Sequence, residues 1–259
     1  MSPATLGVIA EHLDDLLRIA ELPDYPNALN GVQLANRGQV SRVAASVDIS
    51  RRVIEQTIQF GANLLIVHHG MFWGGLQPLR GSQYERLRLL LDNDIAVYSA
   101  HLPLDAHPEV GNNSLLAREL GLTPTGGFAE YQGLMIGVRG EVRASTAMLL
   151  ERAQAFAVRH GGAVRATPID TGRMTTRWAI CTGAGASAST MAEASAAGID
   201  TLIVGEGPHW TAVDAPEAGM VIIYAGHYAT ETLGVCALAE RVADRFGIPW
   251  SFVEAPTGL

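Results

Sequence analysis

Residues 42–67 read RVAASVDISRRVIEQTIQFGANLLIV, and this stretch decides the fold class. Two short apolar runs, 43–47 and 64–67, flank a segment at 51–60 whose apolar side chains recur at helical spacing. A strand, a helix and a second strand in this order are typical of a parallel α/β sheet. The alternation continues along the chain. Further strands are predicted at 95–99, 135–138, 178–181, 201–204 and 221–224, and further helices at 83–91, 114–120, 146–159, 189–197 and 232–246.

The two halves of the chain resemble each other. Residues 42–48 and 61–67 have counterparts at 177–183 and 198–204, and IAVYSAH at 95–101 matches VIIYAGH at 221–227. We therefore predict two pseudo-equivalent α/β lobes with mostly parallel sheets, 1–125 and 126–259, with a site in the cleft between them. The linker-like segment 123–127 marks the boundary. The general likeness of all parallel strands is the alternative explanation.

Composition and charge exclude several classes of protein. Of 259 residues, 48% are hydrophobic and 17% are charged, so the chain has enough apolar surface to fold. A net charge of −8 argues against nucleic-acid binding, and the sequence has no apolar run long enough for a membrane span. Cys181 and Cys236 form no C-x-x-C pair. A reduced protein whose N-terminus lacks a signal pattern is expected to be cytoplasmic.

Histidines and acids gather after the predicted strands. Because ligands of open α/β sheets bind beyond the carboxyl ends of the strands, this edge is the expected site. Imidazole and carboxylate without thiolate suit Zn, Mn, Fe, Co or Ni. The residues that follow strands are His68, His69, His101, Glu206, His209 and His227.

Each of these motifs also has a simpler explanation. The pair His68-His69 could serve two neighbouring ions, or be a turn with one buried, hydrogen-bonded imidazole. His227 and Glu231 are one helical turn apart and so share a face, although an ordinary surface pair has the same spacing. The stretch from His101 to Asp105 contains a proline and is predicted to be a loop, in which Asp105 could instead cap a turn.

Three glycine-rich, polar or aromatic stretches are harder to interpret. Gly183-Ala-Gly185 is expected to be a tight turn, with a phosphate cradle at a helix N-terminus as the alternative. Gly111-Asn-Asn113 is expected to end a loop and cap a helix, with a ligand-facing Asn as the alternative. Met71-Phe-Trp73 is expected to pack in the core, with a wall that stacks on a substrate as the alternative.

Three motifs together resemble a known family. They are HHGMFW at 68–73, HLPLDAHPEVGNN at 101–113 and GHYATE at 226–231, and NGVQ at 30–33, VD at 47–48 and GE at 205–206 also fit. The chain resembles, over nearly its whole length, the dinuclear-metal family called GTP cyclohydrolase 1 type 2 homolog or Nif3-like. The sequence GEGPH at 205–209 departs from many members, which leaves the roles of Glu206 and His209 open.

The resemblance implies a pair of divalent metal ions and a toroidal homohexamer. The implied metal ligands are His68, His69, Asp105, His227 and Glu231, with Glu231 bridging the two ions and His101 outside the ligand set. It also implies a metal-dependent hydrolase of a nucleotide-like or phosphorylated small molecule. A proton shuttle in that reaction would be His101, Glu206 or His209. The alternative function is a non-enzymatic metal-binding or regulatory hexamer.

Overall fold

A computed structural model describes residues 4–75 and 77–259. Residues 1–3, part of the N-terminal sequence from which a cytoplasmic location is predicted, lie outside the described residues. The chain groups into two compact units. Unit 1 runs to Leu104 and includes Gly234–Ala255, and unit 2 comprises Asp105–Leu233 and Pro256–Leu259. The predicted limits 1–125 and 126–259 differ from this division in two places. Residues 105–125 belong to unit 2, and Gly234–Ala255, with the last long helix and the last strand, belong to unit 1.

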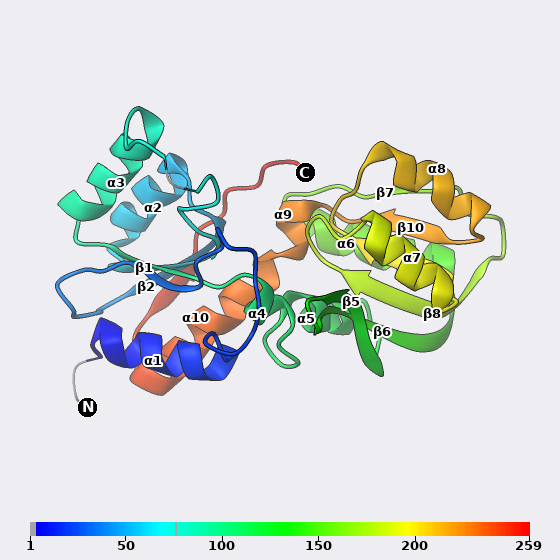
Figure 1. Ribbon diagram of the computed structural model, residues 1–259, viewed down its shortest axis with the longest axis horizontal. Helices are drawn as coiled ribbons and strands as arrows, with labels where there is room; N and C mark the ends of the chain where they lie inside the picture. The colour runs from blue at the N-terminus through cyan, green and yellow to red at the C-terminus, as the bar shows by residue number, and fades with distance from the viewer. Residues whose placement is uncertain (1–3, 76) are drawn as a thin grey trace. The chain divides into compact units, whose positions relative to one another are not determined.

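Unit 1 contains a five-stranded sheet covered on both faces (Figure 1). Helices α2 (Arg51–Phe60) and α3 (Ser82–Asp92) cover one face, and α1 (Leu6–Leu17) and α10 (Thr232–Phe246) cover the other. Strand β1 is antiparallel to its neighbour and the other pairings are parallel. The strand order is β1 (Gly31–Leu34), β4 (Ala96–Ser99), β3 (Leu64–His69), β2 (Val43–Asp48) and β11 (Trp250–Phe252).

The connection between β2 and β3 shows why the sequence folds in this way. The Ser50 side chain accepts a hydrogen bond from the Val53 N–H at the start of α2, and Gly61 ends the helix in the left-handed region at φ 72°. The buried face of α2 places Val53 and Ile54 against the sheet. The bounds of this helix are those predicted from the sequence.

Unit 2 contains a six-stranded sheet with a parallel centre. Helices α5 (Asn112–Glu119) and α6 (Thr146–Arg159) pack on one face, and α7 (Ala188–Ala196) and α8 (His209–Glu217) on the other. Strands β8, β9 and β10 are parallel, and the remaining pairings are antiparallel. The order is β5 (Gly126–Tyr131), β6 (Leu134–Ser145), β8 (Met174–Cys181), β9 (Thr201–Val204), β10 (Val221–Tyr224) and β7 (Arg165–Ala166).

The two units share a topology. Each has three adjacent parallel strands in sequence order, β2-β3-β4 and β8-β9-β10, and each adds a short antiparallel strand beside the third. The predicted α/β class with two similar lobes is therefore confirmed. The predicted loop after His101 is wrong, because Leu102–Asp105 forms the single helical turn α4. Pro103 is compatible with this turn because a first helical turn needs no proline N–H.

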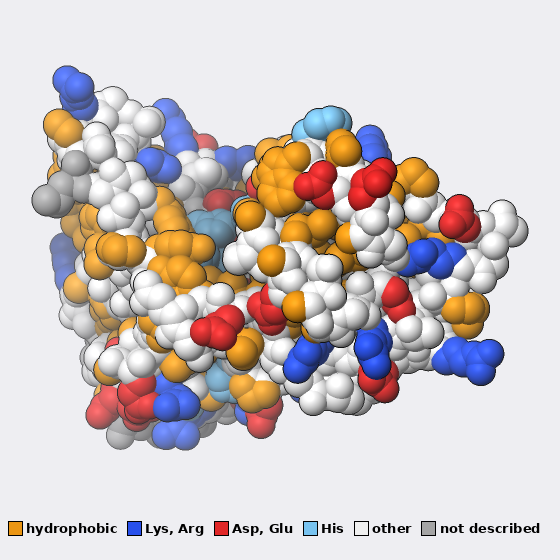
Figure 2. All heavy atoms as spheres, turned by 45° about the vertical axis from the view of Figure 1, so that its right-hand side comes forward, with side chains coloured by type: hydrophobic (Ala, Val, Ile, Leu, Met, Phe, Trp, Pro, Cys, Tyr) orange, Lys and Arg blue, Asp and Glu red, His pale blue; other side chains and the backbone are white. Residues whose placement is uncertain are grey.

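None of the helices in residues 4–75 and 77–259 is long and apolar enough to cross a membrane. On the face shown in Figure 2, arginine and acidic side chains are interspersed among hydrophobic side chains, drawn in orange, and uncharged polar side chains and backbone, drawn in white. A cytoplasmic location stays a prediction.

Candidate functional site

The first group of candidate ligands lies in unit 1, at the carboxyl ends of two neighbouring parallel strands. His68 and His69 end β3, and His101 follows β4. Val67 pairs with Ser99, so the two strand ends lie side by side. One ring nitrogen from each of the three histidines lies within 4.8 Å of the others. The predicted gathering of histidines at the sheet edge is therefore observed within this unit.

Each ring in this group is held through its Nδ1 atom. The Nδ1 of His68 lies 2.8 Å from the Ala100 carbonyl oxygen, which can only accept, so this Nδ1 carries the proton. The Nδ1 of His69 lies 2.8 Å from a carboxylate oxygen of Asp48, and that of His101 lies 2.9 Å from one of Asp24. This pattern leaves Nε2 of each ring as the nitrogen suited to bind a metal.

Sequence reasoning did not assign either carboxylate partner to the site. Asp48 ends β2 opposite His69 of β3, so the pairing of the two strands was a signal that could have found it. Asp24 lies in a connection without regular structure and has no such signal. Burial raises the pKa of Asp24, but its hydrogen bonds to His101 and Asn30 and the His101 charge outweigh this effect and lower the pKa below its ordinary value.

Aromatic rings line this group. The Trp73 ring meets the His101 ring edge-on at 4.6 Å between centroids and the His69 ring at 5.8 Å. The exposed Tyr25 ring lies 5.9 Å from that of His101. Trp73 is half-buried, so it packs against the imidazoles instead of joining the main core. The expected packing in the core is observed for Met71 but not for Trp73, and the alternative, a wall that stacks on a substrate, stays a hypothesis.

The second group lies in unit 2, after β10. Gly226, at φ 92°, precedes α9 (His227–Thr230), and Glu231 follows that helix. The His227 Nε2 lies 3.2 Å from a carboxylate oxygen of Glu231, whose side chain is 4% exposed. The predicted helical turn therefore brings this pair together. The His227 Nδ1 lies 2.8 Å from Glu206, which follows β9.

The charges around His227 favour its protonated form. Burial lowers the pKa of this imidazole, but hydrogen bonds to Glu231 and Glu206 and their charges outweigh burial and raise it to about 9. A cation that binds at Nε2 must therefore displace a proton at neutral pH. Glu206 thus holds an imidazole in place, and its role as a proton shuttle stays a prediction.

Asp105, at the end of α4, is buried and held by the first turn of α5. The Asn112 amide donates to its carboxylate at 2.9 Å, and the Asn113 amide donates to its carbonyl oxygen at 3.3 Å. The Asn113 side-chain oxygen also accepts the Thr182 N–H at 2.8 Å. The two asparagines lie inside α5, which begins two residues earlier than predicted, and they position Asp105 relative to the strand end at β8.

The turn at Gly183 approaches the second group closely. Gly183 has φ 62°, and a β-carbon there would overlap the Glu231 carboxylate oxygen and lie 3.3 Å from the His227 Nε2. Its N–H donates to the Thr230 hydroxyl at 3.1 Å, so this donor is already used. The glycine therefore fits the predicted tight turn, and its lack of a side chain makes room for Glu231.

Replacing Gly183 by Ala should remove metal binding from the second group. The new methyl group would push the Glu231 carboxylate away, and the left-handed backbone would add strain of about 1 kcal/mol. Gly172→Ala is the matched control, because Gly172 has φ 78° and open space around it. Both variants should lose stability in urea through the strained backbone, Gly183→Ala the more because of the overlap, but only Gly183→Ala should lose zinc in metal analysis. Equal zinc content in the two variants would contradict this role.

His209 and Cys181 are two further residues that the sequence analysis named. His209 is exposed as the first residue of α8 and belongs to neither of the groups found among the described residues. Burial, followed by the charges of Asp105 and Glu231, raises the pKa of the Cys181 thiol well above its ordinary range. Burial and these negative charges therefore favour the neutral thiol of Cys181.

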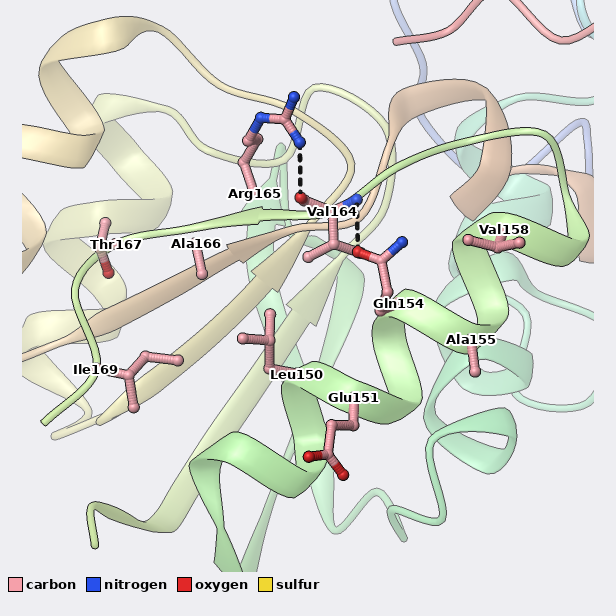
Figure 3. Close-up of a pocket in the computed structure, with 10 residues that line it drawn as sticks. All are labelled: Leu150, Glu151, Gln154, Ala155, Val158, Val164, Arg165, Ala166, Thr167 and Ile169. Carbon is pink, nitrogen blue, oxygen red and sulfur yellow. Dashed lines mark hydrogen bonds between the residues drawn. The ribbon is translucent and has the colours of Figure 1, made fainter. Parts of the chain in front are cut away.

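A large groove in unit 2 has a different character. It has a volume of about 780 Å³ and lies between α6 and the segment 164–169, with Leu150, Val158 and Ile169 among its lining residues (Figure 3). The Val164 N–H donates to the Gln154 side chain across one end. None of the predicted site residues lines this groove.

The donor sets fit divalent metal ions of the first transition row. Both groups offer imidazole nitrogen, unit 2 adds carboxylate oxygen, and the rings are fixed by oxygen acceptors at Nδ1. Histidine ligands that donate their second N–H to carboxylate or carbonyl oxygen are a recurrent feature of metal sites. The structure and sequence thus define a two-unit α/β protein with groups of residues that could hold metal.

Comparison with known proteins gives the family. Residues 4–257 match the model of the family described as Duf34/NIF3 (NGG1p interacting factor 3), and the chain belongs to this family. A relative from Deinococcus radiodurans is 43% identical over 95% of this chain and 92% of its own length, and one from Halobacterium salinarum is 40% identical over 97% and 98%. Both are named "GTP cyclohydrolase 1 type 2 homolog". The resemblance stated from the motifs is confirmed.

Solved structures agree with this assignment. The chain is similar to protein ybgI, with a TM-score of 0.88 and 34% identity over 98% of this chain and all of that one. It is also similar to TTHA1606 from Thermus thermophilus, with a TM-score of 0.84, 34% identity and the same coverage.

Proposed function

We propose that this protein binds two divalent metal ions and uses them to hydrolyse a nucleotide-like or phosphorylated small molecule. The proposed ligands are His68, His69, Asp105, His227 and Glu231. The observation that supports metal binding best is that every histidine of the set has its Nδ1 on a carbonyl or carboxylate oxygen at 2.8 Å. The names of the relatives support GTP as the first substrate to test.

The protein's own residues would perform distinct tasks. Asp48 and Glu206 orient the imidazoles of His69 and His227, and Asn112 orients Asp105. A bound divalent ion supplies Lewis acidity toward a phosphoryl or carbonyl oxygen of the substrate. His101 lies beside His68 and His69 and is the best-placed group to take up a proton.

The experiment that tests this function is a reconstitution. Metal-free protein is loaded separately with Zn²⁺, Mn²⁺, Fe²⁺, Co²⁺ or Ni²⁺ and assayed with GTP, other nucleotides and phosphomonoesters. We expect turnover with at least one substrate, loss of turnover on chelation, and no turnover in Glu231→Gln. Tight metal binding without turnover on the whole panel would favour a metal-binding or regulatory protein instead.

We also propose that the protein forms a toroidal homohexamer. The family resemblance motivates this assembly, and closed symmetric homo-oligomers are the common outcome for soluble chains. Light scattering after size exclusion should give about six times the chain mass of 27.5 kDa. A monomer over a wide range of protein concentration would rule out this assembly.

A further inference from the structure

The pair formed by Asp24 and His101 differs from the other carboxylate–imidazole pairs. The side chains of His101 and Asp24 are only 10% and 7% exposed. By contrast, Asp48 beside His69 is 39% exposed, and Glu206 beside His227 is 42% exposed. Electrostatic interactions are stronger in such a buried setting because water screens them less. The Asp24–His101 pair is thus the best-enclosed pair of the three.

Hydrogen bonds fix the Asp24 carboxylate on both oxygens. Its Oδ2 accepts from the Asn30 amide at 2.8 Å and from the Leu102 N–H at 2.9 Å. Its Oδ1 accepts from the Tyr25 N–H at 2.6 Å and faces the His101 Nδ1 at 2.9 Å. Asn30 also accepts the His101 N–H at 2.7 Å. Both the ring and the backbone of His101 are therefore held.

We propose that Asp24 is the positioning residue of His101. It keeps the imidazole proton on Nδ1, so that the Nε2 lone pair remains available beside His68 and His69. The use of that lone pair to accept a proton rests on the proposed hydrolytic function. The preference for one tautomer does not rest on that function, because it follows from the hydrogen bonds of Asp24 alone.

An amide at position 24 would reverse this arrangement. Asn has one accepting oxygen and one donating NH₂ group, whereas the carboxylate accepts on both sides. The two donors at Oδ2, from Asn30 and Leu102, outnumber the single Tyr25 N–H at Oδ1 and so favour the amide oxygen on the Oδ2 side. The NH₂ group would then face the His101 Nδ1, which could only accept, and the imidazole proton would move to Nε2. Replacement of the carboxylate in a Ser-His-Asp triad by an amide has this tautomeric effect.

The test is nitrogen NMR of zinc-loaded protein with ¹⁵N-labelled histidine. The signals of His101 are identified by their loss in His101→Gln. We expect the Nδ1–H tautomer in the wild type and in Asp24→Glu, and the Nε2–H tautomer in Asp24→Asn. Asp48→Asn is the matched control and should leave the His101 signals unchanged. Zinc content should be the same in wild type and Asp24→Asn.

Three outcomes would overturn the proposal. They are an Nε2–H tautomer in the wild type, the same tautomer in wild type and Asp24→Asn, and loss of zinc from Asp24→Asn as complete as from His69→Ala. The GTP assay separates this inference from the proposed function. If the His101 tautomer switches in Asp24→Asn but the wild type does not turn over GTP, the positioning role is supported and hydrolysis is not. If the wild type turns over GTP but the tautomer is the same in Asp24→Asn, hydrolysis is supported and the positioning role is not.

Discussion

Replacement of His69 by Ala should remove at least one divalent ion from the protein while the fold persists. Removal of a residue that only hydrogen-bonds to a metal ligand lowers metal affinity roughly 10–100-fold. Removal of His69, a proposed ligand itself, should lower metal affinity by more than this. The fold should persist because His69 ends β3, whereas the core of that strand is built from Leu64, Leu65, Ile66 and Val67. Metal analysis and circular dichroism measure the two effects, and Asp105→Ala should behave in the same way.

His12→Ala is the matched control for this experiment. The His12 ring meets the Phe246 ring edge-on at 5.8 Å and is not part of either candidate group among the described residues. Its removal should leave the metal content unchanged. Full occupancy in both His69→Ala and Asp105→Ala would refute the proposed ligand set.

Glu231→Gln should cost at least one ion and abolish metal-dependent turnover. The Glu231 carboxylate is almost fully buried, lies 3.2 Å from the His227 Nε2 and has two oxygens that could hold two ions. The amide keeps the size of the side chain but offers only one accepting oxygen and presents hydrogen atoms on the other side. Metal analysis and the GTP assay test this prediction together.

Glu151→Gln, an exposed change on α6, is the control with the same chemistry. It should retain both ions and full turnover. If Glu231→Gln also retains two ions, the carboxylate does not bridge them, and the proposed bridging role of Glu231 is wrong.

Hydrophobic periodicity predicted the parallel centre of each sheet. Helices α2, α6 and α10 have the predicted bounds, and β9 and β10 do as well. These elements are buried on one or both faces, so their apolar spacing follows directly from packing. Strand β6 is longer than predicted, because its exposed positions carry Arg139, Glu141 and Arg143 and disrupt the apolar pattern.

The candidate ligands were predictable for a different reason. Parallel strands deliver their last residues to one edge, so His68, His69 and His101 could be grouped from strand positions alone. The partners of His101 and Asp105 could not be predicted, because Asp24 lies outside regular structure and the sequence around Asn112 is typical of a helix cap. Hydrogen bonds across 77 residues, as between Asp24 and His101, leave no periodic trace in a sequence.

Unit 1 is built from two distant pieces of the chain, which has a consequence for biosynthesis. Trp250 pairs with Val43 and Phe252 with Ala45, and the Ser46 hydroxyl donates to the Val253 carbonyl oxygen at 3.0 Å. The sheet that carries His68 and His69 therefore lacks its edge strand β11 until residues 250–252 have been synthesised. Unit 2, apart from residues 256–259, has by then been synthesised in full.

A nascent chain would thus expose the edge of β2 and the sheet face covered by α10 throughout the synthesis of unit 2. Unpaired strand edges and apolar faces are sites of aggregation before folding is complete. Ribosome-stalled chains ending before Gly234 should accordingly be held by chaperones, and synthesis of residues 234–255 would add the missing helix and complete the sheet.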